Sequence, residues 1–374
     1  MELSRHRLQL GDILFARRGA QATGLSAIVD RRHEGALCGT GALLLRVRSP
    51  RVDPSYLAVL LSSDTSYRWL RMHAVGAVMP NLNTDIIKSL PLELPGIDEQ
   101  RGLARFLGAV DDRITLLRET NTTLEAIAQA LFKSWFVDFD PVRAKQQGLA
   151  PAGMDEATAA MFPDSFEDSV LGSVPKGWKV HPLDEIANYL NGLALQKFPP
   201  SDDSWLPVIK IAQLRKGDTV GADRAGRNLK PEYFVQNGDV LFSWSGSLEV
   251  EVWCGGEGAL NQHLFKVTSK AYPKWFYLRW TRHHLDHFRQ IAASKATTMG
   301  HIQRAHLSEA KVLVPPEALL GAMGACFSPL LARSVENELQ AQTLATLRDT
   351  LLPRLISGQL RLPEAQELAA EAAA

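Results

Sequence analysis

The residues from Asp98 to Phe136 constrain this chain more than any other stretch, because they form one long helical pattern with a narrow apolar seam. Apolar side chains recur there in alternating steps of four and three residues, which is a heptad spacing. At about 1.5 Å per residue such a helix is roughly 58 Å long. A long helix with a narrow seam needs a partner helix to cover it. The predicted seam residues are Leu107, Val110, Ile114, Leu117, Leu124, Leu131 and Trp135.

One polar residue, Asn121, interrupts this seam, and such a residue costs stability but can fix register and the choice of partner. The partner helix is expected from the same chain. At an offset of 220 residues, the last part of this seam corresponds to a second apolar seam near the C-terminus. We therefore predict that the two helices form an antiparallel coiled-coil pair. Pro353 is expected to end or kink the second helix. Two unrelated core helices are the alternative. The second seam consists of Leu344, Leu351 and Leu355.

The repeat extends beyond the two helices. LQLGDILFARRGA near the N-terminus parallels VQNGDVLFSWSGS in the second half, and EGALCGTGALLLRV parallels EGALNQHLFKV. The stretch that ends at Pro95 and the stretch that ends at Pro315 both indicate a helix, a polar loop, a short helix and a strand. The pattern therefore predicts an α+β fold with two copies of one mixed domain.

The segment between the copies is rich in Pro, Gly and small residues, which is typical of a linker. Sixty-one residues separate Gly177 from Gly238, but only ten precede the equivalent Gly11, so we expect the first domain to lack its front part. The tail is expected to be frayed. The predicted ranges are a first domain at 1–96, a first long helix at 97–137, a linker at 138–174, a second domain at 175–316, a second long helix at 317–362 and a tail at 363–374.

Charge and cysteine content narrow the class of protein. The 41 Lys and Arg residues balance the 41 Asp and Glu residues, so bulk charge does not direct the chain to nucleic acid. Residues 1–50 and 279–295 are locally basic, which fits DNA contact and a solvated helix face about equally well. The three cysteines lie far apart, which suggests a reducing cytoplasm. The absence of an eighteen-residue apolar run predicts no membrane span.

Motifs for catalysis and metal binding are absent from the sequence. It has no G-x-x-x-x-G-K-[ST] and no Asn-Pro-Pro-Tyr-like methyltransferase loop. His283, His284 and His287 have helical spacing and could hold a metal, but no third carboxylate or thiol is evident to complete the site. A polar helix face is therefore the better interpretation. Glu249 and Glu251 lack the adjacent Lys expected of a nuclease. We predict no catalytic residue, no metal site and no cofactor.

Several motifs resemble the specificity subunit of type I restriction–modification systems. They are GDILF and GDVLF, MPNLN, the stretch LFKSWFVDFDPVRAK…GMDEATAAMFPDSFEDSVLGSVPKGW, and the closing LLPRLISGQL. The resemblance implies two target-recognition domains that each read half of a bipartite DNA sequence, with the long helices as a spacer. It implies double-stranded DNA, methyltransferase subunits and a motor-nuclease subunit as partners. A second specificity chain is a further candidate partner.

Polar side chains on the loops of both copies are the candidates for DNA contact, because Arg, Asn and Gln read base edges while Lys and backbone amides hold phosphate. Loop polarity without DNA contact is about as good an explanation for any single residue. The candidates are Arg17, Arg18, Gln213, Arg215, Lys216, Ser243, Ser245, Ser247, Asn261, Gln262, His263, Thr297, Thr298, His301 and Gln303.

The preferred hypothesis is a non-catalytic subunit that reads DNA for a restriction–modification assembly. The alternative is a truncated scaffold that binds methyltransferase partners without reading DNA fully. If the front of the first domain is missing, the second domain is expected to be the fully competent reader. A methyltransferase with its own recognition domain is disfavoured because the cofactor and catalytic loops are missing.

Overall fold

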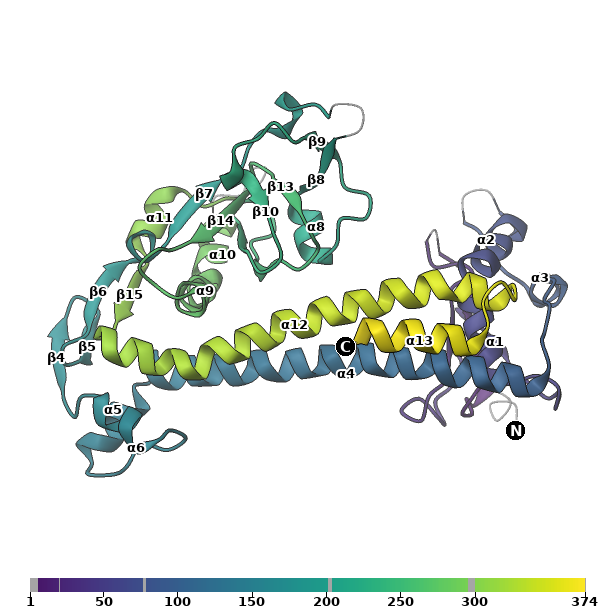
Figure 1. Cartoon of the computed structure of the whole chain (residues 1–374), viewed down its shortest axis with the longest axis horizontal. Coiled ribbons are helices and arrows are strands. Elements are labelled where there is room, and N and C mark those ends of the chain that lie inside the picture. The colour runs from purple at the N-terminus through teal and green to yellow at the C-terminus, as the bar shows by residue number, and fades with distance from the viewer. Residues whose placement is uncertain (1–5, 20, 77–78, 201–203, 295–299, 374) are drawn as a thin grey trace. The chain divides into compact units, whose positions relative to one another are not determined.

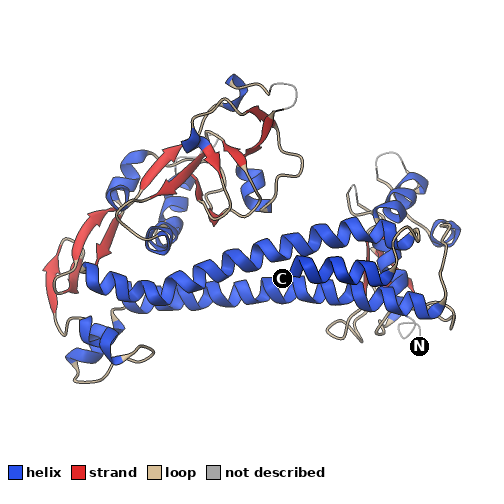
Figure 2. Ribbon diagram, in the orientation of Figure 1, coloured by secondary structure: helices blue, strands red, loops and turns tan. Residues whose placement is uncertain are grey.

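The computed structural model describes residues 6–19, 21–76, 79–200, 204–294 and 300–373. The chain divides into two compact units, which we call unit 1 (residues 1–116 and 340–374) and unit 2 (residues 117–339). Figure 1 labels their elements, and Figure 2 shows that each unit combines helices with strands. The expected mixed class of fold is therefore confirmed.

Unit 1 contains a three-stranded antiparallel sheet in the order β2-β1-β3. Ile13 and Phe15 of β1 are fully buried in its core. Side chains of Asp53, Ser63 and Asn83 cap the three helices that follow the sheet. The elements are β1 (Ile13–Ala16), β2 (Ser26–Ile28), β3 (Ala42–Leu45), α1 (Pro54–Ser62), α2 (Asp64–His73), α3 (Thr84–Ser89) and the C-terminal α13 (Leu362–Ala373).

Unit 2 is larger and contains two four-stranded sheets, in the orders β12-β11-β14-β7 and β10-β13-β8-β9. Two further strand pairs, β15-β6 and β4-β5, complete it. Its helices are α5 (Asp140–Gln146), α6 (Glu156–Met161), α7 (Leu183–Ile186), α8 (Ile211–Lys216), α9 (Lys274–His283), α10 (Leu285–Ser294) and α11 (Arg304–Glu309). Two short 3-10 helices are Leu195–Lys197 and Pro231–Tyr233. Its strands are β4 (Phe166–Ser169), β5 (Gly172–Pro175), β6 (Lys179–Pro182), β7 (Asn188–Asn191), β8 (Trp205–Ile209), β9 (Arg224–Gly226), β10 (Phe234–Val235), β11 (Val240–Ser243), β12 (Val250–Val252), β13 (Gly258–Leu260), β14 (Leu264–Thr268) and β15 (Lys311–Val314).

The central strands of the two units pair in the same register. In unit 1, Ile13 lies opposite Ile28 on one side and Leu45 on the other. In unit 2, Val240 lies opposite Val252 and Val267 in the same way. Strands β1, β2 and β3 therefore correspond to β11, β12 and β14, so the sequence repeat is a repeat of structure.

Two helices of 40 residues each, α4 (Ile97–Phe136) and α12 (Glu317–Ile356), each have one part in unit 1 and the other part in unit 2. Their contacts within each unit are antiparallel. In unit 1, Leu103 and Leu107 cluster with Leu351 and Leu355. In unit 2, the ring of Trp135 lies 5.6 Å from that of Phe327. Among the predicted seam residues, Leu124, Leu131 and Asn121 are half-buried, and the buried ones are Leu107, Val110, Ile114, Leu117, Trp135, Leu344, Leu351 and Leu355.

The polar break in the seam has a polar partner on α12. The side-chain amide of Asn121 donates to the carbonyl of Ser334 at 2.9 Å, and the amide of Asn337 donates to Asn121 Oδ1 at 3.0 Å. Asn337 is 1% exposed. A buried amide pair favours the one register that satisfies both groups, because any shift leaves them unpaired.

Helix α12 is the one described helix that is long and apolar enough to cross a membrane, by length and composition alone. Its most apolar stretch of eighteen residues has a mean hydropathy of 1.4. Leu319, Met323 and Phe327 of this helix lie in the buried core cluster of unit 2. Because 22% of that apolar stretch is buried, these side chains pack through one face of α12 and the helix is not enclosed by the core.

Four segments differ from the expected secondary structure. Residues 91–94, expected as the strand that ends at Pro95, form no strand. The predicted linker contains α5, α6 and the β4-β5 hairpin, and its Val142 and Phe162 belong to the buried core of unit 2. The tail is not frayed: α13 packs in unit 1, where Ala365 is fully buried. Helix α12 continues through Pro353 to Ile356. Local composition missed the last three features because burial against distant residues stabilises them.

Candidate nucleic-acid interface

Three loops of unit 2 lie beside one another at one end of β11 and β14. The backbone N–H of Trp244, which follows β11, donates to the carbonyl of His263 at 3.3 Å. The carbonyl of Trp244 accepts from the N–H of Ile302 at 3.0 Å. The N–H of Gly246 donates to the carbonyl of Gly300 at 2.9 Å. We call the loops at 244–247, 261–263 and 300–303 the unit 2 reading loops.

The side chains on these loops form a mixed aromatic and polar cluster. The indole N–H of Trp244 donates to Asn191 Oδ1 at 2.9 Å and to the carbonyl of Gln262 at 3.1 Å. The hydroxyl of Ser245 and Nδ1 of His263 are 2.9 Å apart. The ring of Trp244 lies 5.9 Å from that of His263 and 6.3 Å from that of His301. Such a cluster presents flat rings together with hydrogen-bonding groups that suit base edges.

Unit 1 repeats two of these three backbone bonds. The N–H of Arg17, which follows β1, donates to the carbonyl of Gly41 at 2.9 Å. The carbonyl of Arg17 accepts from the N–H of Leu82 at 3.0 Å. Arg17, Gly41 and Leu82 therefore occupy the places of Trp244, His263 and Ile302. We call the loops at 17–19, 39–41 and 80–83 the unit 1 reading loops.

A backbone bridge completes this correspondence. Arg18 pairs with Asn81 in unit 1, as Ser245 pairs with His301 in unit 2. The two sets of loops therefore share one framework but differ in chemistry, since unit 1 places two arginines where unit 2 places a tryptophan and a serine.

Three buried polar atoms on the reading loops have no hydrogen-bond partner among the described residues. They are Nε of Arg17, Oδ1 of Asn81 and Oε1 of Gln262. Buried polar atoms are normally paired, so a group of unpaired ones in corresponding loops needs an explanation. Five further buried atoms of described residues outside these loops are also unpaired, so the three atoms do not by themselves mark a contact surface.

The other predicted contact residues lie apart from this cluster or support its backbone. The hydroxyl of Ser243 donates to the carbonyl of Ser247 at 2.6 Å and is 0% exposed, and Asn261 Oδ1 accepts from the N–H of His263. Gln213 caps α8, and Gln303 caps α11. Arg215 pairs with Glu249 and Lys216 with Asp218. Thr297 and Thr298 lie outside the described residues.

Sequence reasoning did not nominate Trp244, Asn191 or Asn81 as contact residues. The MPNLN motif contains Asn81, and Trp244 lies within the GDVLF stretch, so the motifs pointed to both loops. No sequence motif pointed to Asn191, because only the pairing of β7 with β14 brings this residue to Trp244.

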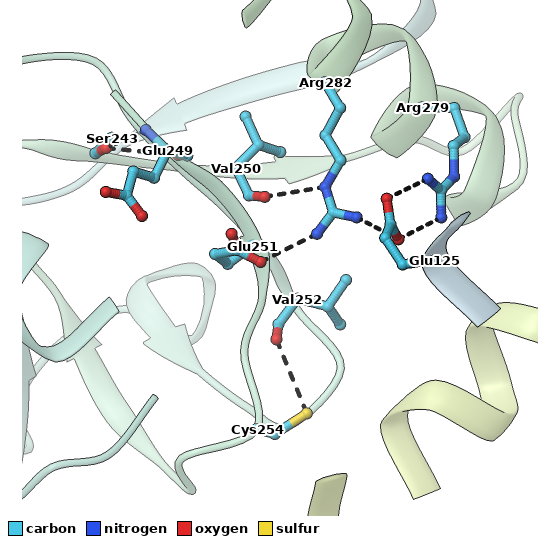
Figure 3. A network of polar contacts seen from close by, with 9 residues as sticks. All are labelled: Glu125, Ser243, Glu249, Val250, Glu251, Val252, Cys254, Arg279 and Arg282. Carbon is cyan, nitrogen blue, oxygen red and sulfur yellow. Dashed lines mark hydrogen bonds and ion pairs between the residues drawn. The ribbon is translucent and has the colours of Figure 1, made fainter. Parts of the chain in front are cut away.

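A charged cluster in unit 2 links α4 to the sheet that carries the reading loops (Figure 3). Both terminal nitrogens of Arg279 bind the carboxylate of Glu125, at 2.5 and 2.7 Å. Arg282 lies between Glu125 at 2.7 Å and Glu251 of β12 at 3.0 Å. Its Nε also donates to the carbonyl of Val250 at 3.1 Å. The cluster therefore joins α4, α9 and β12.

Burial and charge act in opposite directions on the two acids of this cluster. Burial alone would raise the pKa of Glu125, but hydrogen bonds from Arg279 and the charges of both arginines outweigh it and lower this pKa. Burial raises the pKa of Glu251, and Arg282 only partly offsets it. Glu125 is therefore the anion that holds Arg279, whose side chain is 8% exposed.

Comparison with known proteins shows the family of this chain. The family model described as type I restriction modification DNA specificity domain matches residues 5–126 and 175–332, so the chain belongs to this family. It is 24% identical to the type I restriction enzyme HindI specificity subunit of Haemophilus influenzae, over 94% of this chain and 87% of that protein. It is also 24% identical to the MjaIX specificity subunit of Methanocaldococcus jannaschii, over 84% of this chain and 70% of that protein.

The fold is also found in a solved structure. The S subunit of the type I restriction–modification system from M. genitalium superimposes with a TM-score of 0.53 at 15% sequence identity. The match covers 94% of this chain and 84% of that one. Among the described residues, no group of three His, Cys, Asp or Glu side chains is placed to hold a metal ion.

Proposed function

We propose that this chain is the sequence-reading, non-catalytic specificity subunit of a type I restriction–modification assembly. Double-stranded DNA is its ligand, and the reading loops of the two units contact base edges in two separate parts of the site. Its partners are methyltransferase subunits and a motor-nuclease subunit, which it directs to that site.

The matched reading loops carry this proposal. Two copies of one backbone framework with different side chains suit a protein that reads two different short sequences. The side chains of Arg17, Asn81 and Gln262 on these loops are of the kinds that pair with base edges or phosphates. The family match supports DNA as the partner.

The neutral net charge predicts that partner subunits contribute to affinity. With 41 basic and 41 acidic residues, the isolated chain lacks the excess of positive charge that drives non-specific DNA binding. We expect specific binding to be sensitive to salt and to be stronger in the presence of the methyltransferase subunit. Tight specific binding by the isolated chain at physiological salt would contradict this.

The direct test is to map methylated positions in cells that carry only this chain and its methyltransferase. We expect methylation at one recurring sequence, and none when this chain is omitted. Purified complexes should bind a duplex with that sequence more tightly than a shuffled duplex. A complex that assembles but methylates no defined sequence would favour the scaffold alternative and overturn the proposal.

A further inference from the structure

Strand β3 of unit 1 leaves one edge without a strand partner among the described residues. It pairs with β1 on one side, and no backbone hydrogen bond joins Leu43, Leu44 or Leu45 to a described residue on the other. Its counterpart β14 is paired on both sides, with β11 and with β7. An open edge of a sheet is a template for another strand.

A second open edge follows the short helix α3. Residues 91–94 correspond to β15, but they form no strand and make no backbone hydrogen bond in the described part of unit 1. In unit 2, β15 pairs along its whole length with β6, from Lys311 opposite Pro182 to Val314 opposite Lys179.

One continuous segment covers both edges in unit 2. Residues 179–191 form β6, the single turn α7 and β7. Leu183, Ile186 and Tyr189 of this segment are at most 2% exposed. The N–H of Leu183 also donates to the carbonyl of Ala310 at 2.8 Å.

Apolar side chains along the unit 1 edges are correspondingly uncovered. Val312 is fully buried in unit 2, whereas its counterpart Leu92 is half-buried. Val267 is 1% exposed, whereas its counterpart Leu45 is half-buried. Leu94 is 41% exposed. These side chains gain burial if a segment like residues 179–191 occupies the edges.

Unit 1 has a lysine at the position where unit 2 has the serine that binds an acidic residue. In unit 2 the carboxylate of Asp184 accepts a hydrogen bond from Ser308 of α11. Six-residue helices α3 and α11 correspond at the offset of 220 residues, so Lys88 takes the place of Ser308. An acidic residue at the start of a docked helical turn therefore meets a lysine in unit 1.

We propose that unit 1 binds a strand–turn–strand segment of another polypeptide along β3 and residues 91–94. The segment has the chemistry of residues 179–191: two short strands, a helical turn with two apolar residues, and an acid that pairs with Lys88. Backbone hydrogen bonds to both edges provide affinity, and the apolar turn and the acid provide selectivity. This inference does not depend on DNA binding.

The test uses the full chain and a labelled synthetic peptide with the sequence of residues 177–193. Fluorescence anisotropy measures binding. Hydrogen exchange measures protection of the amide of Leu44, which faces the open edge because the amides of Leu43 and Leu45 face β1. We expect saturable binding and at least about tenfold slower exchange at the Leu44 amide. A shuffled peptide of the same composition is the control and should do neither.

A charge exchange tests the register. Lys88→Glu should weaken binding on the order of fivefold, and a peptide with Asp184→Lys should restore it. Leu94→Asp, at an exposed position that leaves the core intact, should weaken binding further. Binding that ignores both substitutions would place the peptide elsewhere and overturn the proposal.

Two other outcomes would also overturn it. No binding at peptide concentrations up to about 1 mM would show that the edges do not accept this segment. Protection of the Leu44 amide without peptide, together with a dimer in sedimentation, would assign the edges to a second copy of this chain.

Discussion

The reading loops of unit 1 and unit 2 share a backbone and differ in their side chains. The bonds from Arg17 to Gly41 and Leu82 have direct counterparts at Trp244 in unit 2. The side chains differ, with cationic groups in one unit and aromatic and neutral groups in the other. The comparison shows that the two units keep one strand register and similar loop backbone bonds while their loop side chains differ. Side chains on a fixed loop can therefore change without disturbing the sheet beneath.

The two units also differ in the contacts between their sheet domains and the long helices. Unit 2 uses the ion cluster of Glu125, Arg279 and Arg282. At the offset of 220 residues, unit 1 has Val59 in place of Arg279 and Ala345 in place of Glu125. An ion cluster demands one geometry, because each charge must keep its partner, whereas apolar side chains tolerate small shifts.

The largest expected effect is on the aromatic core of unit 2. Phe327 is 1% exposed, and its ring stacks on Trp275 at 4.4 Å. Phe327→Ala should lower the free energy of unfolding by about 4 kcal/mol. Tryptophan fluorescence during urea denaturation measures this change, because seven of the eight tryptophans lie in unit 2.

The matched variant is Leu107→Ala, at the corresponding position of unit 1. If the units unfold independently, this variant should leave the tryptophan transition unchanged. An equal shift of the tryptophan transition in both variants would show that the long helices couple the two units. It would contradict independent unfolding.

The second effect is a pH dependence confined to unit 2. Burial, with smaller contributions from His283 and His287, lowers the pKa of His284 from 6.5 to about 4, and its Nε2 donates to the carbonyl of Lys311. The folded protein then binds fewer protons than the unfolded chain between these values. Stability is therefore fully present above pH 6.5 and falls by up to about 3 kcal/mol as pH decreases toward 4.

Denaturation of wild type and His284→Gln at pH 7.5 and pH 5 checks this expectation. The variant should lose less stability than wild type on acidification, and His287→Gln, at an exposed position, should behave as wild type. Identical losses in all three proteins would contradict it. Unit 1 has Asp64 at the equivalent position and should lack this contribution.

The third effect concerns the ion cluster. Glu125→Gln should lower the stability of unit 2 by about 2 kcal/mol, because it leaves Arg279 buried without a carboxylate. Glu336→Gln removes one member of an exposed pair with Arg333 on α12 and should change stability by less than about 0.5 kcal/mol. Equal effects from the two substitutions would mean that the cluster is no more than a surface ion pair.

The smallest expected effects are on specificity. Under the proposed function, Trp244→Ala and Arg17→Ala should each relax a different part of the recognised sequence, by about 1–2 kcal/mol of discrimination. Methylated sites mapped for each variant decide this. Relaxation of the same positions by both variants would show that the two sets of loops do not read separate sequences.

Much of the architecture was predictable from the sequence because it arises from repetition and periodicity. The heptad seam predicted the long helices α4 and α12, and the two Gly-Asp stretches predicted corresponding strands β1 and β11. Asn121 was recognisable as an exception to an apolar pattern. Such signals depend on residues close together in sequence or on a comparison of two copies.

Contacts between distant residues were decided only by the tertiary structure. Nothing in the sequence pairs Glu125 with Arg279, Asn191 with Trp244, or Asn121 with Asn337, because each pair is far apart in the chain. The open edge of β3 likewise follows from which strand lies beside it, since a strand sequence does not specify how many of its edges are paired. Sequence therefore determined the repeated elements and where the loops fall, whereas packing decided which side chains meet on them.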